Sequence, residues 1–327
     1  MRYYLVLNPG SKGGKSRKTF ERIFQLFHQN NIEFDYKITA SLQDAYKFSV
    51  DANQKGYDII VAVGGDGTIN RVVNGFYDAE GNRTSTTAIL GVIYTGTSPD
   101  FCKSYHIPTI LDQAVQVLLT GKTKSIQIGK IVHTCIYDAQ YDNQPVSQVK
   151  TGLKTTYFTC CANIGIGAAL ARRANGGVRK YIGDIAGTFL SLIITLWRYQ
   201  PSSFTVGFDG NMRRIEKVFN LSIGKTTFIA SGIKVKNDLL PEDKRFYHLL
   251  VKSLRWTNWL SVFRAIYSGK QITNNALISL QYAEKIEVYG NHQNPEIEFD
   301  GDPGGFLPCT IETAQYAIEL ICGGYHE

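Results

Sequence analysis

The sequence contains one stretch, IIVAVGGDGTIN, that runs from Ile59 to Asn70 and decides the fold. Its first five residues are all apolar, which is typical of a parallel strand buried on both faces. Three glycines then fall within four positions around Asp66. Such glycines let the backbone approach a ligand closely or adopt positive φ, and the N-terminus of a following helix favours a phosphate. We therefore predict a phosphate-binding joint, with Asp66 placed to hold a metal ion or accept a proton; a plain turn would need only one glycine.

Strand and helix patterns alternate on both sides of this stretch, as far as Gly121. Continuous apolar runs predict strands at Tyr3 to Leu7 and Ala88 to Tyr94. Three helices are predicted by apolar residues at helical spacing, which are Phe20, Ile23, Phe24 and Phe27, then Ile69, Val72, Val73 and Phe76, then Leu111, Ala114, Val115 and Leu118. This order predicts an α/β domain with a parallel sheet and helices on its faces.

Glycine-rich or polar loops follow the other strands of the predicted sheet. The first strand ends in NPGSKGGKS, from Asn8 to Ser16, which offers backbone donors and lysines but lacks the spacing of a Walker A loop. Thr39 and Thr97 lie in loops after two further strands. Loops at the carboxyl ends of parallel strands share one crevice, so we expect all of them to face the same ligand. Turn and capping chemistry is the alternative for each loop.

The pattern changes near Lys122, after which strand signals dominate. The predicted strands are Ser125 to His133, Tyr157 to Asn163, Phe204 to Phe208, Val218 to Ile223, Phe246 to Lys252, Ile286 to Tyr289 and Glu296 to Phe299. Turn-rich segments such as Asp142 to Pro145 separate them. We therefore predict an antiparallel β-sandwich domain, interrupted by helices at about Gly183 to Tyr199 and near Trp256 to Ser268.

Two segments of the second half carry carboxylates. FDGDPGG, from Phe299 to Gly305, places Asp300 and Asp302 on either side of a glycine. Phosphoryl transfer to a hydroxyl needs a carboxylate near that hydroxyl, but Asp-Gly is also the commonest signal of a hairpin turn. LLPEDK, from Leu239 to Lys244, is either a surface turn or a metal-binding loop. Residue types alone leave both alternatives open.

The composition indicates a globular protein. The chain has 327 residues, of which 43% are hydrophobic and 19% charged, and its length suits two domains. The net charge of +7 suits an anionic small molecule or membrane surface, whereas no long basic run supports nucleic-acid binding. The six cysteines form no Cys-x-x-Cys pair, so we expect reduced thiols in a cytosolic protein. The N-terminus lacks a signal-peptide pattern, and the apolar run from Ile185 to Trp197 is too short to span a membrane.

Several motifs, taken in order, resemble the diacylglycerol-kinase-type lipid kinases, which include bacterial diacylglycerol kinase and sphingosine kinase relatives. The resemblance covers essentially the whole chain. The motifs are Asn8-Pro9 with the loop after it, Gly64 to Asn70, Gly96-Thr97 with Asp100-Phe101, Asn163 to Gly167, Tyr181 to Gly183, and Asp300 to Asp302. The Gly-Gly-Asp-Gly element alone is shared with NAD kinases and looks similar in phosphofructokinases.

The resemblance implies two domains with ATP in the cleft between them. The α/β domain would comprise residues 1–125, joined by about 307–327 returning to it, and the β-sandwich domain residues 126–306. The residues expected at the nucleotide are Asn8, Gly10, Ser11, Thr39, Gly64, Gly65, Asp66, Gly67, Thr68, Ile69, Asn70 and Thr97. Asp302 holds the place of the proton acceptor, with Asp66 as a second catalytic carboxylate. A structural magnesium site of some bacterial members maps to Leu240, Asp243 and Arg245.

Two positions depart from the family pattern. The family usually has Gly-Thr-Ala-Asn-Asp-Phe, but this chain has Pro99 in place of the asparagine, which removes a backbone donor and an amide side chain. Asp302 replaces a glutamate and is shorter by one methylene. A base must come within about 2.6–3.2 Å of its proton or act through water. Both departures bear on the acceptor side of the reaction.

The activity implied is ATP-dependent transfer of the γ-phosphate to the hydroxyl of diacylglycerol or a related lipid, with Mg²⁺ as cofactor and a role in phospholipid biosynthesis. Arg172, Arg173, Arg179 and Lys180 precede the apolar segment, and a basic, apolar surface of this kind attracts anionic lipid. The alternative for this helix is a core element of the second domain. We therefore expect a cytoplasmic enzyme that associates peripherally with the membrane, and a homodimer is a candidate assembly. A soluble-substrate kinase of the NAD-kinase type and a non-catalytic nucleotide-binding regulatory protein are the alternatives.

Overall fold

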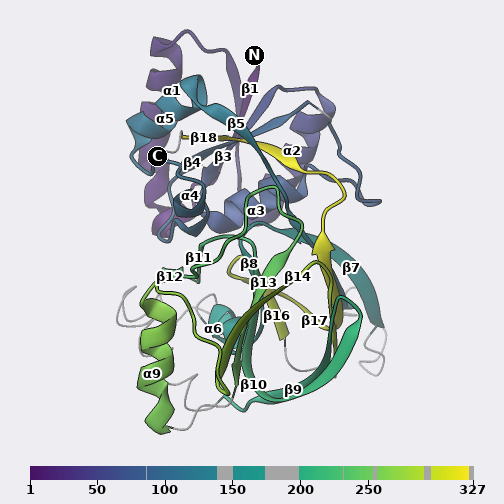
Figure 1. Cartoon of the computed structure of the whole chain (residues 1–327). Coiled ribbons are helices and arrows are strands. Elements are labelled where there is room, and N and C mark those ends of the chain that lie inside the picture. Colours follow the sequence, from purple (N-terminus) through teal and green to yellow (C-terminus); the bar gives the residue numbers. More distant parts are fainter. Residues whose placement is uncertain are drawn as a thin grey trace.

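A computed structural model of the chain describes residues 1–85, 87–137, 150–173, 199–230, 232–252, 256–290 and 296–323. A six-stranded α/β layer lies above a β-rich part (Figure 1). Several predicted features fall outside the described residues, namely the turn at Asp142 to Pro145, Arg179, Lys180, the motif Tyr181 to Gly183, the apolar run Ile185 to Trp197, and the helix predicted around it except for Tyr199. Within the described ranges, no helix has the length and apolar character of a membrane span.

The upper sheet has the strand order β2-β1-β3-β4-β18-β5. Its strands are β1 (Tyr3–Leu7), β2 (Phe34–Ile38), β3 (Ile59–Gly64), β4 (Ile89–Tyr94), β5 (Lys122–Ile126) and β18 (Ile318–Cys322). All neighbours are parallel except β5, which is antiparallel to β18. β1 and β3 are buried along their whole length, as their continuous apolar runs predict.

Helices cover both faces of this sheet. They are α1 (Phe20–Gln29), α2 (Leu42–Gln54), α3 (Asp66–Asn74), α4 (Asp100–Ser104) and α5 (Leu111–Thr120). Successive strand residues point to opposite faces. Leu5 and Val61 therefore pack in one core with residues of α1 and α5, whereas Val6 and Ala62 pack in another with residues of α2 and α3.

Two helical segments differ from the prediction. A 3-10 helix, η1 (Ser11–Thr19), occupies much of the glycine-rich loop after β1, so α1 begins only at Phe20. The helix α2 was not predicted, because its buried positions are small or polar and give no apolar periodicity. These positions are Ala45, Ser49, Ala52 and Asn53.

The lower part is a ten-stranded sheet in which all pairings are antiparallel. Its strands are β6 (Gly129–Tyr137), β7 (Lys150–Phe158), β8 (Cys161–Gly165), β9 (Ser202–Phe208), β10 (Asn211–Gly224), β13 (Phe246–Lys252), β14 (Ile278–Ala283), β15 (Ile286–Tyr289), β16 (Glu296–Phe299) and β17 (Asp302–Thr313). The long strand β10 pairs with β9 through its first half and with β8 and β13 through its second half, so the sheet curves back on itself around one apolar core. The predicted antiparallel β domain is confirmed.

Smaller elements complete this part. They are the strand pair β11 (Phe228–Ile229) and β12 (Ile233–Lys234), and the helices α6 (Ile166–Arg173) and α9 (Trp256–Tyr267). The predicted strand from Tyr157 to Asn163 is in fact two strands, β7 and β8, separated by a short turn at Thr159 and Cys160. That turn holds the candidate active site, as described below.

The chain crosses between the two sheets twice. β5 belongs to the upper sheet and β6, from Gly129, to the lower one. The return was expected from about residue 307, but Leu307 to Thr313 still lie in β17 of the lower sheet, and the upper sheet receives β18 from Ile318. β18 lies between β4 and β5, so the upper sheet contains a strand from the far end of the chain.

Candidate active site

The joint between β3 and α3 is the centre of the site. Gly65 caps α3 in an extended conformation, and its carbonyl accepts the amides of Thr68 (2.9 Å) and Ile69 (3.0 Å). The first N–H groups of a helix have no partner within it and are available to a ligand. A Cβ atom on Gly64 would lie 2.3 Å from Thr68 Oγ1, and one on Gly96 would lie 2.7 Å from the Cα atom of Gly65. These glycines are therefore required by close packing, and neither adopts positive φ.

The loops that follow β1 and β2 reach the same joint. Asn8 Nδ2 donates to Thr68 Oγ1 at 2.8 Å, and Asn8 Oδ1 accepts the amide of Gly10 at 2.9 Å. Thr39 donates its amide to the Leu7 carbonyl at 2.9 Å, which places it beside the start of the first loop. These contacts support the expectation that the strand ends share one ligand site.

The loop after β4 closes the other side of the joint. The Thr95 amide donates to the Gly64 carbonyl at 2.9 Å, and the Asp100 amide donates to Asp66 Oδ2 at 3.2 Å. Thr97 lies in this loop and is exposed. Pro99 precedes the short helix α4 at its N-cap. The loop of Thr97 therefore lies next to the carboxylate of Asp66.

Three residues expected at the nucleotide have side chains that support the joint from within. Thr68 is buried against Asn8, and Ile69 belongs to the core beneath the sheet. Asn70 Nδ2 donates to the Tyr157 carbonyl at 2.8 Å and to Asp300 Oδ2 at 2.9 Å. The amides of Thr68 and Ile69 are already bonded to Gly65, and the Asn70 side chain connects the two halves of the molecule.

Asp66 is partly exposed, but one of its carboxylate oxygens is held away from water. Its Oδ1 atom is buried and has no hydrogen-bond partner among the described residues. Burial raises the pKa of Asp66 to about 8, and the negative charges of Asp100 and Asp300 add to the rise. An acid perturbed in this way within a crevice is a candidate for function, because a cation bound there would restore its charge.

Asp300 fastens the turn between β16 and β17 to the turn between β7 and β8. Its carboxylate accepts the amides of Thr159 (2.6 Å), Cys160 (2.8 Å) and Cys161 (3.1 Å), in addition to Asn70. Asp300 has φ of 48° and Gly301 has φ of 93°, as a tight turn requires. The segment therefore forms the hairpin turn that was the alternative prediction. Through the hydrogen bond from Asn70 to Asp300, the same turn also connects the two sheets.

Asp302 lies beside the glycine joint. A Cβ atom on Gly67 would lie 3.7 Å from Asp302 Oδ2, and Arg71 Nη2 lies 3.6 Å from the same oxygen. The two carboxylates predicted as catalytic, Asp66 and Asp302, thus come from opposite sheets and meet at the first turn of α3. Arg71 was missed, although it immediately follows the stretch on which the prediction rested.

The two halves of the chain match two family models. Residues 2–131 match the diacylglycerol kinase catalytic domain, and residues 161–322 match the YegS C-terminal NAD kinase beta sandwich-like domain. The chain belongs to the diacylglycerol-kinase-type family. Diacylglycerol kinase of Bacillus subtilis (strain 168) is 25% identical over 306 residues, which cover 93% of this chain and 90% of that protein. Diacylglycerol kinase of Staphylococcus saprophyticus is 23% identical over 317 residues, which cover 97% and 94%.

Solved structures show the same fold. Two crystal structures from Bacillus anthracis str. Sterne match this diacylglycerol-kinase-type chain with TM-scores of 0.72 and 0.65, at 20% and 18% sequence identity. Each match covers 98% of this chain and 97% of the other. At this identity the likeness establishes the architecture of the chain.

A buried glutamate that sequence reasoning missed supports the turn carrying Asp302. Glu298 accepts hydrogen bonds from Asn163 Nδ2 at 2.6 Å and from the Gly301 amide. Burial raises the pKa of Glu298 to about 7, while these two hydrogen bonds oppose the rise. Asn163 Oδ1 in turn accepts from Ser222 Oγ at 2.6 Å. A polar network within the lower sheet therefore fixes the backbone next to Asp302.

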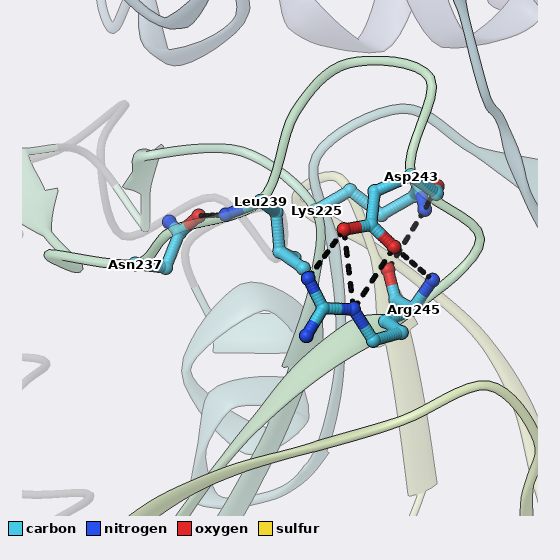
Figure 2. A network of polar contacts seen from close by, with 5 residues as sticks. All are labelled: Lys225, Asn237, Leu239, Asp243 and Arg245. Atoms are coloured by element: carbon cyan, nitrogen blue, oxygen red, sulfur yellow. Dashed lines mark hydrogen bonds and ion pairs between the residues drawn. The ribbon is translucent and has the colours of Figure 1, made fainter.

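The magnesium loop implied by the resemblance does not fit a metal ion in this diacylglycerol-kinase-type chain. Figure 2 shows that the Asp243 carboxylate is bound by Arg245, through Nε at 3.1 Å and Nη2 at 2.6 Å. The Leu240 carbonyl accepts the Asp243 amide at 3.0 Å. The described residues contain no group of three or more His, Cys, Asp or Glu that could hold a metal ion. The structure therefore gives Asp243, Leu240 and Arg245 partners within the chain in place of a metal ion.

The six cysteines lie within the described residues and are free thiols. Burial raises the pKa of the Cys102, Cys160 and Cys161 thiols well above the ordinary value. A buried thiol of raised pKa is a poor nucleophile. The cysteines near the site therefore act as packing groups.

Proposed function

We propose that this chain is an ATP-dependent lipid kinase that transfers the γ-phosphate of ATP to the hydroxyl of diacylglycerol or a related lipid. The observation that carries the proposal is the position of Asp302, whose carboxylate lies beside Gly67 at the phosphate-binding joint. A phosphate held at the joint would thus lie next to a carboxylate contributed by the other sheet. Phosphoryl transfer to an alcohol needs this pairing.

In the proposed reaction, backbone amides at the β3–α3 joint hold the phosphates of ATP, and the loop after β1, with Asn8, Gly10 and Ser11, lies against them. Thr39 and Thr97 flank the nucleotide. Asp302 orients the lipid hydroxyl and accepts its proton as the oxygen bonds to the γ-phosphorus. The bond from that phosphorus to the β,γ-bridging oxygen breaks, and ADP leaves.

ATP would enter as its magnesium complex, in which the ion neutralises phosphate charge. Mg²⁺ typically takes one or two carboxylates, with phosphate oxygens and water completing its shell. Asp66 fits this role, because its buried Oδ1 lacks a hydrogen-bond partner among the described residues. Asp100, whose amide bonds to Asp66, is the second carboxylate in place.

The substrate places the proposed enzyme at a membrane surface. The net charge of +7 supports peripheral association with anionic lipid, and we propose a cytoplasmic enzyme of phospholipid biosynthesis. Sedimentation with vesicles of neutral and of anionic lipid would test this. Equal binding to both, or binding to neither, would contradict the proposed association.

The activity is tested with γ-labelled ATP and a panel of acceptors. The panel contains vesicles with diacylglycerol, monoacylglycerol or sphingosine, and NAD as a soluble acceptor. We expect labelled lipid, formed at least about 100-fold more slowly by Asp302→Asn. Label on NAD alone would support the soluble-substrate alternative, and nucleotide binding without transfer to any acceptor would support a regulatory protein.

A further inference from the structure

The loop before β13 is held by a buried ammonium group. Lys225 Nζ donates to the carbonyl oxygens of Asp243 at 2.6 Å and of Arg245 at 2.9 Å (Figure 2). The same ammonium lies 4.5 Å from the centre of the Phe246 ring, and Lys225 is only 9% exposed. Carbonyl oxygens that converge on one point are also how a loop binds a metal cation. Here the cation belongs to the chain.

The Asp243 carboxylate and the Leu240 carbonyl of this loop are also paired without a metal ion. The carboxylate of Asp243 forms a two-point ion pair with Arg245, so its negative charge is already balanced. The Leu240 carbonyl is bonded within the loop. A divalent ion would have to displace both the ammonium and the guanidinium, and the loop would then carry an excess of positive charge.

We propose that Lys225 takes the place of a divalent cation in this loop, so that the loop folds without metal. The ammonium group supplies the positive charge that the carbonyl oxygens of Asp243 and Arg245 would otherwise take from a metal ion. Because this charge is on a side chain, it is covalently part of the protein and cannot dissociate. This inference does not depend on the proposed lipid-kinase activity.

The position of the loop makes this attachment important for the active site. The Pro241 carbonyl accepts the amide of Gln127, in the connection between β5 and β6, at 2.8 Å. The Lys225 amide donates to the Cys160 carbonyl at 3.1 Å, and the Cys160 amide donates to Asp300. Lys225 thus joins the crossing between the sheets to the turn that carries Asp302.

The first test measures metal dependence in the double variant Asp66→Asn, Asp100→Asn, which removes both carboxylates proposed to meet magnesium at the nucleotide. The melting temperature is measured without nucleotide, in EDTA and then with MgCl₂ or CaCl₂ against NaCl of equal ionic strength. We expect the same melting temperature in all conditions. A rise with either divalent ion would overturn the proposal, as would a divalent ion that remains bound after dialysis at one per chain.

The second test compares Lys225→Ala with Lys244→Ala. Lys244 is exposed in the same loop, so its removal deletes the same charge without freeing the two carbonyls. We expect Lys225→Ala to lower the melting temperature by about 4 °C or more and Lys244→Ala to leave it unchanged. An unchanged melting temperature for Lys225→Ala would overturn the proposal. If Lys225→Ala does not fold, the metal measurement on the Lys225-containing protein still decides.

Discussion

At the scale of single residues, the two carboxylates of the candidate site, Asp66 and Asp302, have different surroundings. Asp66 is enclosed by the joint and by two further carboxylates, whereas Asp302 is partly exposed beside Arg71. An enclosed acid near like charges suits binding of a cation, and a partly exposed acid suits proton exchange with an incoming hydroxyl. The two residues should therefore respond differently to substitution.

Replacing Asp302 should impair the chemical step. Asp302→Asn keeps the size of the side chain but cannot accept a proton, so we expect kcat to fall about 10²–10⁴-fold with little change in KM for ATP. Asp302→Glu restores the residue usual in the family and should retain activity. Steady-state kinetics on the lipid acceptor measures both variants. Wild-type kcat in Asp302→Asn would exclude a role as base.

Replacing Asp66 should make the metal-free protein more stable at high pH. The folded-state pKa of Asp66 is about 8, above its ordinary value of 3.8, so the stability that its proton provides is complete below that ordinary value and is lost as pH rises through 8. Asp66→Asn removes this loss. Its advantage in melting temperature over wild type should grow from about pH 5 to about pH 9, measured in EDTA without nucleotide, while turnover is abolished. A constant difference across pH would refute the assigned burial.

At the scale of elements, the site depends on how closely β3, α3 and the loop after β4 approach one another. The β3–α3 joint has no room for a side chain at Gly64, whereas Gly67 faces Asp302 with ordinary van der Waals space. Gly64 therefore allows β3 and α3 to pack closely, whereas Gly67 keeps the crevice beside Asp302 open.

Two alanine substitutions distinguish these roles. Gly64→Ala places a methyl group against Thr68 and should cost about 1–3 kcal/mol of unfolding free energy. Gly67→Ala should leave stability near that of wild type but raise KM for ATP, because the methyl group would point into the nucleotide crevice. Urea denaturation and kinetics compare the pair. Equal stability of both variants would contradict the packing argument.

Prediction from sequence succeeded where elements are defined by their own residues. β1 and β3 are buried on both faces, so their apolar runs identified them and placed the loops at their ends. The connections made by backbone groups were not predictable, since a carbonyl partner leaves no sequence signal. Lys225, which donates to two carbonyls, and the backbone amides that donate to Asp300 belong to this class. The helix α2 was missed for another reason, because its buried residues are small or polar and give no apolar periodicity.

At the scale of the whole molecule, the two sheets are joined by contacts between α3 and the β7–β8 region. The rings of Tyr77 and Tyr157 stack at 4.1 Å, and Asn74 exchanges hydrogen bonds with the backbone of Tyr157. Asp300 binds Asn70 from below. The position of the proposed base therefore depends on the docking of the two sheets.

Removing the Asp300 carboxylate should weaken this docking. Asp300→Ala leaves the amides of Thr159, Cys160 and Cys161 without their acceptor, which should cost about 3 kcal/mol and lower activity as well. Asp302→Asn, only two residues away, should lose activity without losing stability. Denaturant unfolding of both variants tests the contrast. Wild-type stability in Asp300→Ala would show that the sheets dock without this residue.

The position of β18 has a consequence for synthesis of the chain. β4 and β5 are made before the β-rich part, but the strand that separates them in the finished sheet is made after it. Until then the edge of β4 lacks its partner, and an open strand edge is prone to pair with other chains. The α/β half therefore cannot complete its sheet before the β-rich half has been made. Ribosome-bound chains stopped before Ile318 should remain protease-sensitive in both halves, and a protected N-terminal fragment would disprove this order.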